Sequence, residues 1–150
     1  MTAWPQVVDR LVTLLPTLPG WLGVTVYDGP PVTQDAPANY VTVGYVVGED
    51  MAGDYEQTDT AGDLTEESGT VRSEIVCTTG NVDLPSVRAR AFQLADAWRA
   101  EIRRDGTLGG VLTLGGSSSL AVDVQPAQTT AGSVQRLTVT LSYMSRSSAQ

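Results

Sequence analysis

Histidine is absent from the 150-residue sequence, and cysteine occurs once, at Cys77. Histidine is the commonest general base and the commonest metal ligand in proteins, so many hydrolytic and metal-dependent sites are unavailable to this chain. A nucleophilic cysteine needs a histidine partner, and one cysteine forms no intrachain disulfide. We therefore expect Cys77 to be a small buried side chain. We also expect the protein to be no enzyme, with no metal and no cofactor.

Long apolar runs are absent as well. No stretch approaches the ~18 consecutive apolar residues that cross a bilayer, and residues 1–5 lack the basic start of a signal peptide. These absences predict no membrane partner and production in a cytoplasm. Hydrophobic residues still make up 41% of the chain, which suits one domain over residues 1–150 with a modest core.

Lysine is missing, and the nine basic residues are all arginine, against 17 acids and a net charge of −8. The whole acidic excess lies in residues 48–70, which contain no basic residue, because the nine acids elsewhere balance the nine arginines. The acids of this segment are Glu49, Asp50, Asp54, Glu56, Asp59, Asp63, Glu66 and Glu67. A chain of this charge is unsuited to binding nucleic acid, which requires a basic surface.

Two segments have the apolar spacing of amphipathic helices. Residues 4–15 are one, with Thr2 as a possible cap and Pro5 in the first turn. The other begins at Asp83 and Pro85 and runs to about Arg104, with acid at its start and arginine at its end, as the helix dipole favours. Its expected apolar stripe is Val87, Ala91, Phe92, Leu94, Ala95, Trp98 and Ile102.

Five segments are rich in β-branched residues or alternate between apolar and polar side chains, which predicts strands. They are residues 23–28, 40–47, 71–79, 120–124 and 134–144. Residues 107–119 are rich in Gly and Ser, which indicates a loop with one short strand. A turn is expected at 129–133 and a polar tail at 145–150.

Residues 48–70 have few large apolar side chains and no sustained periodicity. We interpret them as a long acidic loop, and two interpretations stay open. The loop is either a solvated segment or a projecting arm that meets a partner or lines a channel.

The expected fold is therefore α/β of the α+β type, with elements in the order α-β-β-β-α-β-β. Direct links between strands favour a mainly antiparallel or mixed sheet with two helices packed on it.

Few catalytic arrangements survive inspection. The acidic segment lacks the ligand spacing of a calcium-binding loop, and the adjacent pair Glu66 and Glu67 has no apolar pocket to raise a pKa. The glycine pairs at 109–110 and 115–116 lack the Lys-Ser/Thr ending of a phosphate-binding loop. Arginine recurs along the second helix, where Arg88, Arg99, Arg103 and Arg104 form either a solvated face or an inter-subunit basic face that pairs with a neighbour's acids.

Several stretches together resemble the tail terminator proteins of long-tailed bacteriophages, of the minor tail protein U type. After the opening helix come VTVYDGPP at 24–31 and YVTVGY at 40–45, followed by the acidic insertion and EIVCTTG at 74–80. The helix from RARAF at 88–92 to RRDG at 103–106 and the closing strand QRLTVTLSY at 135–143 complete the likeness. It covers nearly the whole chain, and the order of elements contributes as much to it as the residues.

The resemblance implies a structural virion protein at the head-proximal end of the tail, assembled in the host cytoplasm. Such proteins form a ring, typically of six subunits, that caps the tail tube, ends its polymerisation and presents a surface to the head. The implied partners are copies of the chain itself, the major tail tube protein and a head-completion protein. DNA passes through the lumen without specific binding, and the eight acids of residues 48–70 line that lumen or reach a neighbouring subunit.

Two alternatives remain open on the sequence alone. A head-completion or neck connector protein has a similar size. A protein-binding module unrelated to virions also fits a chain without catalytic groups.

Overall fold

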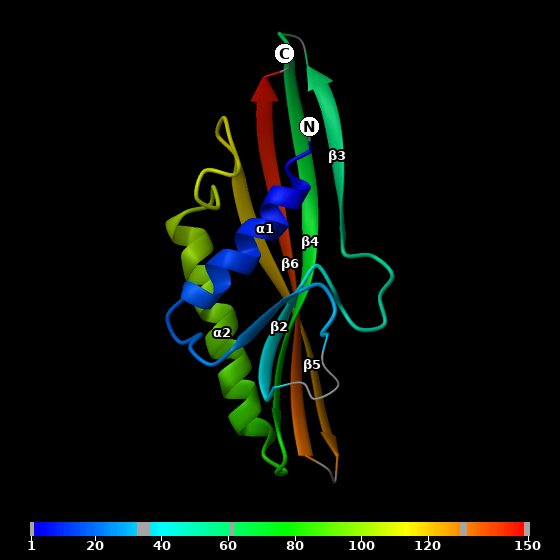
Figure 1. Ribbon diagram of the computed structural model, residues 1–150, viewed down its shortest axis with the longest axis vertical. Helices are drawn as coiled ribbons and strands as arrows, with labels where there is room; N and C mark the ends of the chain where they lie inside the picture. Colours follow the sequence, from blue (N-terminus) through cyan, green and yellow to red (C-terminus); the bar gives the residue numbers. More distant parts are fainter. Residues whose placement is uncertain (1, 33–36, 61, 130–131, 149–150) are drawn as a thin grey trace.

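The computed structural model describes residues 2–32, 37–60, 62–129 and 132–148. Figure 1 shows a long, twisted sheet with helices on one side. The elements in chain order are α1 (Trp4–Leu14), the short 3-10 helix η1 (Leu15–Thr17), β1 (Thr25–Asp28), β2 (Asn39–Val43), β3 (Gly53–Thr60), β4 (Leu64–Thr79), α2 (Leu84–Arg104), β5 (Ser117–Thr129) and β6 (Gly132–Ser148).

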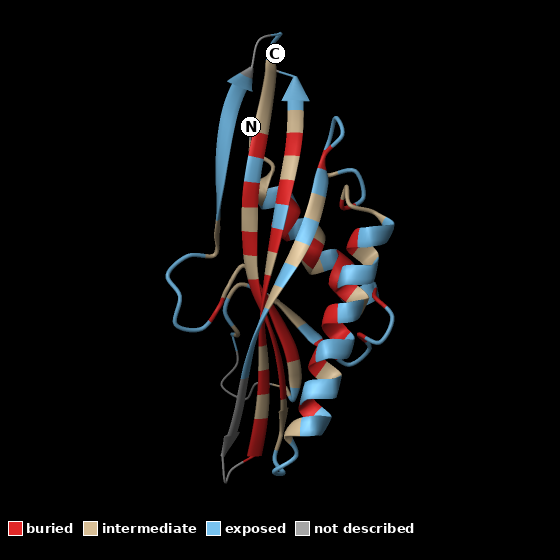
Figure 2. Cartoon of the chain, turned by 180° about the vertical axis from the view of Figure 1, so that it is seen from behind, coloured by how far each residue is buried: buried red, intermediate tan, exposed pale blue. Residues whose placement is uncertain are grey.

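The strands form one mixed sheet in the order β1-β2-β4-β6-β5, and β3 pairs with the remaining half of β4. Only the short pair β1–β2 is parallel among the described strands, and the other pairs are antiparallel. Both helices cover the same face, in front of the sheet in Figure 1 and behind it in Figure 2. The predicted α+β fold, a mainly antiparallel sheet with two helices on it, is confirmed.

Helix α2 begins where the sequence predicted. The Asp83 side chain accepts a hydrogen bond from the backbone N–H of Ser86 at 3.2 Å, and Pro85 occupies the first turn. A cap of this kind is typically worth about 0.5–2 kcal/mol. The expected stripe is buried against the sheet except for Phe92, which is 36% exposed. Phe92 therefore lies on the flank of the helix and not in the core.

The main core is the layer between the two helices and the sheet. It includes Cys77, which is fully buried as expected, and the two tryptophans Trp21 and Trp98, whose rings meet edge to face at 6.2 Å. Trp21 also donates its indole N–H to the carbonyl of Leu94 at 3.2 Å. This contact fastens the segment after α1 onto α2.

The segment 48–70 is not the long loop that we expected. Residues 53–60 form β3 and residues 64–70 form the first half of β4, and the two strands pair from Gly53–Val71 to Thr60–Leu64. The order of elements is therefore α-β-β-β-β-α-β-β, with one strand more than predicted. A strand with polar side chains on both faces has no apolar alternation, and its pairing with β4 alone defines it.

The last two strands are also longer than predicted. Strand β5 begins at Ser117 and continues through Pro126, and β6 includes residues 145–148, which we expected in a polar tail. No strand lies within residues 107–116, which the structure describes as turns. Residues 130–131 of the expected turn and residues 149–150 of the tail lie outside the described residues.

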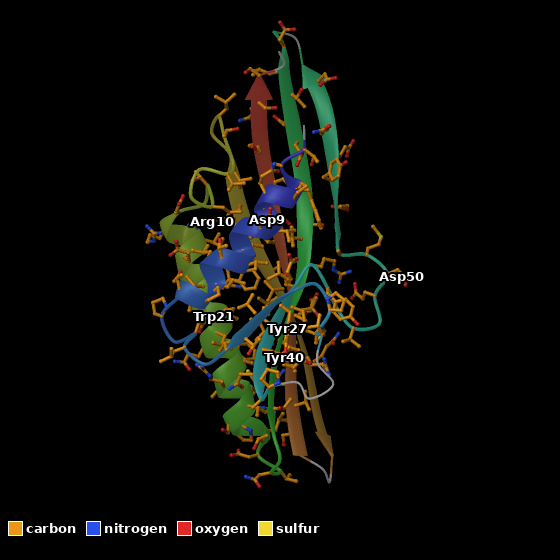
Figure 3. The ribbon with its side chains drawn as sticks, viewed as in Figure 1. Asp9, Arg10, Trp21, Tyr27, Tyr40 and Asp50 are labelled. Carbon is orange, nitrogen blue, oxygen red and sulfur yellow. The ribbon has the colours of Figure 1, made fainter. Side chains whose placement is uncertain are left out.

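The sheet face opposite the helices is partly buried too. Tyr40, Val46 and Val76 are each less than 9% exposed but lie outside the main core cluster. The rings of Tyr27 and Tyr40 meet edge to face at 5.9 Å on β1 and β2 (Figure 3). This smaller cluster explains why β2, between β1 and β4, is apolar on both faces.

Candidate assembly surfaces

The acidic segment forms an arm that extends past both helices. We define the acidic arm as β3, its connection to β4 and residues 64–70 of β4, which run alongside the end of β6 (Figure 1). The described residues of β3 are exposed for nearly the whole length of the strand (Figure 2). Strand β3 of the arm is therefore open to solvent along most of its length.

The eight acids predicted as one surface divide into three groups. Glu49 pairs with Arg72, and Glu66 pairs with Arg146 at 2.9 Å. Glu67 is buried. The other five are exposed and form no ion pair with any described residue: Asp50, Asp54, Glu56, Asp59 and Asp63. Asp50 lies apart from the others, on the connection between β2 and β3 (Figure 3).

Glu67 connects the arm to the start of helix α1 through hydrogen bonds. Its carboxylate accepts hydrogen bonds from the backbone N–H of Ala3 at 3.0 Å and from the side-chain amide of Gln57 at 2.9 Å. The Tyr143 hydroxyl donates a third bond at 2.6 Å. Ala3 is the N-cap residue of α1, so a carboxylate from β4 also stabilises the positive end of the helix dipole. Thr2, which we expected as a possible cap, lies one residue before the N-cap Ala3, and its hydroxyl accepts a hydrogen bond from the N–H of Trp4 at 3.1 Å.

The hydrogen bonds decide the charge of Glu67. Burial alone would raise the pKa of its carboxyl group, but donors from Tyr143, Thr2, Ala3 and Gln57 together lower that pKa below its ordinary value. Glu67 is therefore an ionised structural group and a poor proton donor near neutral pH. Sequence reasoning placed Glu67 on the acidic surface and missed its partners Gln57 and Tyr143, because the three residues lie on three different strands.

The four arginines predicted as a basic face of α2 also differ in whether they have an ion-pair partner. Arg104 pairs with Glu101 one turn earlier and is therefore committed within its own helix. Arg88, Arg99 and Arg103 are exposed and have no acidic partner among the described residues. Arg88 lies near the start of α2, whereas Arg99 and Arg103 share its last two turns.

Arg99 and Arg103 line a groove between α2 and the edge strand β5. The groove has a volume of about 280 Å³, and its other walls are Ile102, Ser118, Ser119 and Leu120. The two arginines are four residues apart and so lie on the same side of the helix, where like charges repel. The groove is therefore a basic surface beside an open strand edge.

A buried ion pair on the opposite sheet face was not predicted as a site. Glu74 is 2% exposed and accepts a hydrogen bond from Arg136 at 2.9 Å, while the Arg136 side chain is one-third exposed. Burial raises the pKa of the Glu74 carboxyl group, and the Arg136 charge opposes that rise. Glu74 and Arg136 sit on neighbouring strands in a diagonal arrangement, and neither position is marked by a motif in the sequence.

The remaining groups of chemical interest are the Cys77 thiol and the side chains that could bind a metal ion. Burial raises the pKa of the Cys77 thiol to about 11, despite the opposing charge of Arg90. Among the described residues, no three His, Cys, Asp or Glu side chains gather closely enough to hold a metal ion. Neither helix in the described part of the chain is both long and apolar enough to cross a bilayer.

No protein-family model matches this sequence, and no curated protein matches it with significant similarity. The function must therefore be argued from the surfaces themselves.

Proposed function

We propose that the chain is a structural virion protein that caps the tail tube of a long-tailed phage. Copies of the chain form a ring, six by analogy with the tail terminators that the sequence resembles. The ring ends tail polymerisation and offers the surface that joins tail to head. Its partners are other copies of itself, the major tail tube protein and a head-completion protein, and DNA passes through its lumen without specific binding.

The observation that carries the proposal is the acidic arm. It extends beyond the helices and bears exposed carboxylates that have no cationic partner among the described residues, at Asp54, Glu56, Asp59 and Asp63. DNA binds proteins by exchanging its condensed counterions for basic side chains, which the arm lacks. An acidic wall repels the phosphates and so allows DNA to slide past it. The same carboxylates suit contacts with arginines on a neighbouring subunit.

The chain's arginines supply such contacts. Arg88, Arg99 and Arg103 are exposed on α2 and have no acidic partner among the described residues. A protein with acids on one surface and unpaired arginines on another has the complementary charges that head-to-tail self-association uses.

Native mass spectrometry across a concentration series tests the ring. The subunit mass is 15.8 kDa, so a closed ring of six is expected near ~95 kDa. Deleting the gene from the phage that encodes it should give overlong tails that fail to join heads. Normal tails after the deletion, or a chain that purifies with heads and not with tails, would contradict the proposal. The second result would favour a neck protein.

The structure sharpens the test of the arm. Replacing all eight acids would also remove the buried Glu67 and the ion pairs of Glu49 and Glu66. The informative variant changes only the five exposed, unpaired acids to their amides: Asp50, Asp54, Glu56, Asp59 and Asp63. We expect a folded protein with abnormal tail length or poor DNA delivery. The control changes Asp9, Asp28, Asp96 and Asp123, which are exposed outside the arm, and should behave as the wild type.

A further inference from the structure

Strand β5 leaves one side of its backbone open. Among the described strands it pairs only with β6, and no backbone group of residues 117–124 has a hydrogen-bond partner outside that pairing in the described part of the chain. Edge strands present unpaired N–H and C=O groups, which makes them templates for another strand. Charged residues and proline usually protect such edges, but Asp123 is the only charge in this stretch and Pro126 lies beyond it.

The groove between α2 and β5 lies beside this open edge. The register pairs Leu120 with Leu141 and Val122 with Val139, and both partners belong to the core beneath the helices. Leu120 and Val122 therefore point to the helix side of the sheet, where they are only partly buried. A strand added to β5 would place every second side chain on that same side, next to the groove.

The charge of the groove favours an acidic occupant. Arg99 and Arg103 line it, are exposed and have no acidic partner among the described residues. Because like charges four residues apart repel on a helix, a carboxylate placed near both arginines would relieve that repulsion. Ile102 and Leu120 provide apolar walls. Strand β5 has no basic residue over 117–124, so α2 supplies the positive charge and supplies it on the helix side only.

Strand β3 of a second copy does not offer this charge in the right place. Gln57 donates to Glu67, whose carboxylate contacts the start of α1, so Gln57 points to the helix side. Asp54 and Glu56 are an odd number of positions away and therefore point to the opposite face. Asp59 points to the helix side, but a threonine of β4 already donates a hydrogen bond to its carboxylate. The occupant that fits the groove is therefore a different chain.

We propose that the β5 edge and its groove bind an extended, acidic segment of another protein, which adds to β5 as a strand and places carboxylates beside Arg99 and Arg103. Backbone hydrogen bonds provide the affinity of such strand addition, and the alternate side chains provide its specificity. The inference goes beyond the proposed function and does not depend on the ring. Arg88, at the other end of α2, stays available for contacts between copies.

A peptide library provides the probe. Random peptides of about eight residues, within the usual length of a strand, are displayed on yeast and selected on the full wild-type chain. We expect the enriched sequences to carry Asp or Glu at alternate positions, because only every second side chain faces the groove. A library that yields no binder, or binders without acids, would overturn the proposal.

The arginines are tested with the best peptide, made synthetically and followed by fluorescence anisotropy. The double variant Arg99→Gln, Arg103→Gln should bind it about tenfold more weakly or worse, as expected when charge partners are removed. Arg88→Gln is the matched control and should bind as the wild type. A scrambled peptide of the same composition should bind poorly. Equal binding of the scrambled peptide, or of the double variant, would overturn the proposal.

N-methylated peptides test strand addition on the unaltered protein. In an added strand, alternate backbone N–H groups point toward β5 and the others point away. Two versions of the peptide are made, each methylated on one alternate set of amides. One version should lose binding and the other should keep most of it. Equal effects of the two sets would mean that no strand is added, and would overturn the proposal.

Hydrogen exchange locates the bound peptide. Exchange should slow in residues 117–124, and protection confined to other strands would overturn the proposal. Dissociation of wild-type oligomers by the peptide would show that a second copy fills the edge, and would overturn the choice of another protein. Peptide binding as expected, together with normal tails after gene deletion, would instead contradict the proposed function alone.

Discussion

Tyr143 occupies the space where any residue other than glycine would carry its Cβ at position 69. A methyl group on Gly69 would lie 2.5 Å from the Tyr143 hydroxyl oxygen and 2.7 Å from the carbonyl oxygen of Asp54. The two residues are paired across β6 and β4. Because position 69 has no side chain, the tyrosine ring crosses β4 and its hydroxyl reaches the buried Glu67. Gly69, Tyr143 and Glu67 thus add a side-chain link between the arm and the body to the backbone pairing of β4 with β6.

Replacing Gly69 with alanine should destabilise the protein. The added methyl group would clash with the Tyr143 ring and with the backbone carbonyl of Asp54, so either the ring or the β3–β4 pairing must shift. Overpacking of this kind typically costs about 1–3 kcal/mol, measurable as a lower midpoint in urea. Gly80→Ala is the control, since no atom lies within 4 Å of its Cβ position. Equal midpoints for the two variants would contradict this account.

Tyr143→Phe should lower the free energy of unfolding while keeping the ring in place. The lost bond is 2.6 Å long and ends on an ionised carboxylate, a class typically worth about 1.5–3 kcal/mol. Tyr55→Phe removes the same hydroxyl from a half-exposed ring with no partner among the described residues, and should change stability little. Thermal unfolding of the two variants checks the difference, and a loss of the same size in both would argue against a role for the Glu67 contact.

The stability contributed by Glu67 should disappear in acid. The pKa of this carboxyl is lowered in the folded protein from its ordinary value of 4.5, so below 4.5 the unfolded state binds the proton more readily. The folded protein therefore loses stability as the pH falls through the pKa that the Glu67 carboxyl has in the folded state. Glu67→Gln should be less stable than the wild type at pH 7, and the gap should narrow below pH 4.5 in urea titrations. A gap independent of pH would contradict the assignment.

The sequence predicted the parts of the fold that rest on apolar periodicity. Helix α2 has a cap at Asp83 and an apolar stripe, and β4 beyond Val71 alternates between core and outer face, so both were found near their true positions. Strand β3 and the arm half of β4 were missed because their side chains are polar on both faces. Backbone pairing makes them strands, between β3 and the adjacent β4 and between β4 and the distant β6, and such pairing leaves no pattern in the side chains.

The sequence predicted the candidate surfaces as sets of charged residues, and the structure shows which of these residues already have a partner within the chain. The sequence could not reveal that Glu67 faces Tyr143 or that Arg104 is held by Glu101, because these partners depend on register and side-chain direction. Pro126 is a related case. The expected strand 120–124 stops short of this proline, but β5 is an edge strand, where a missing N–H can face solvent and the strand continues.

Glu74 should respond to pH in the opposite sense to Glu67. Burial raises the pKa of its carboxyl above 4.5 in the folded protein, so the folded state holds the proton in a range where the unfolded state has lost it. Stability therefore falls as pH rises from 4.5 through the folded pKa. The stability of the wild type relative to Glu74→Gln should decline over that range in urea titrations. Glu56, which is exposed and has no ion pair with any described residue, provides the control Glu56→Gln, and a wild-type advantage that grows with pH at position 74 would contradict the prediction.

Cys77 should react with a thiol reagent only when the chain unfolds. The side chain is fully buried, and its pKa is raised to about 11, so about one molecule in a thousand carries a thiolate at pH 8. Access and ionisation thus both oppose reaction in the folded state. Labelling with Ellman's reagent should be slow in buffer and complete in urea above the midpoint, whereas an exposed cysteine introduced by Ser119→Cys should react within minutes without urea. Fast labelling of the wild type in buffer would mean that β4 opens locally near its C-terminal end, where it lies between β2 and β6.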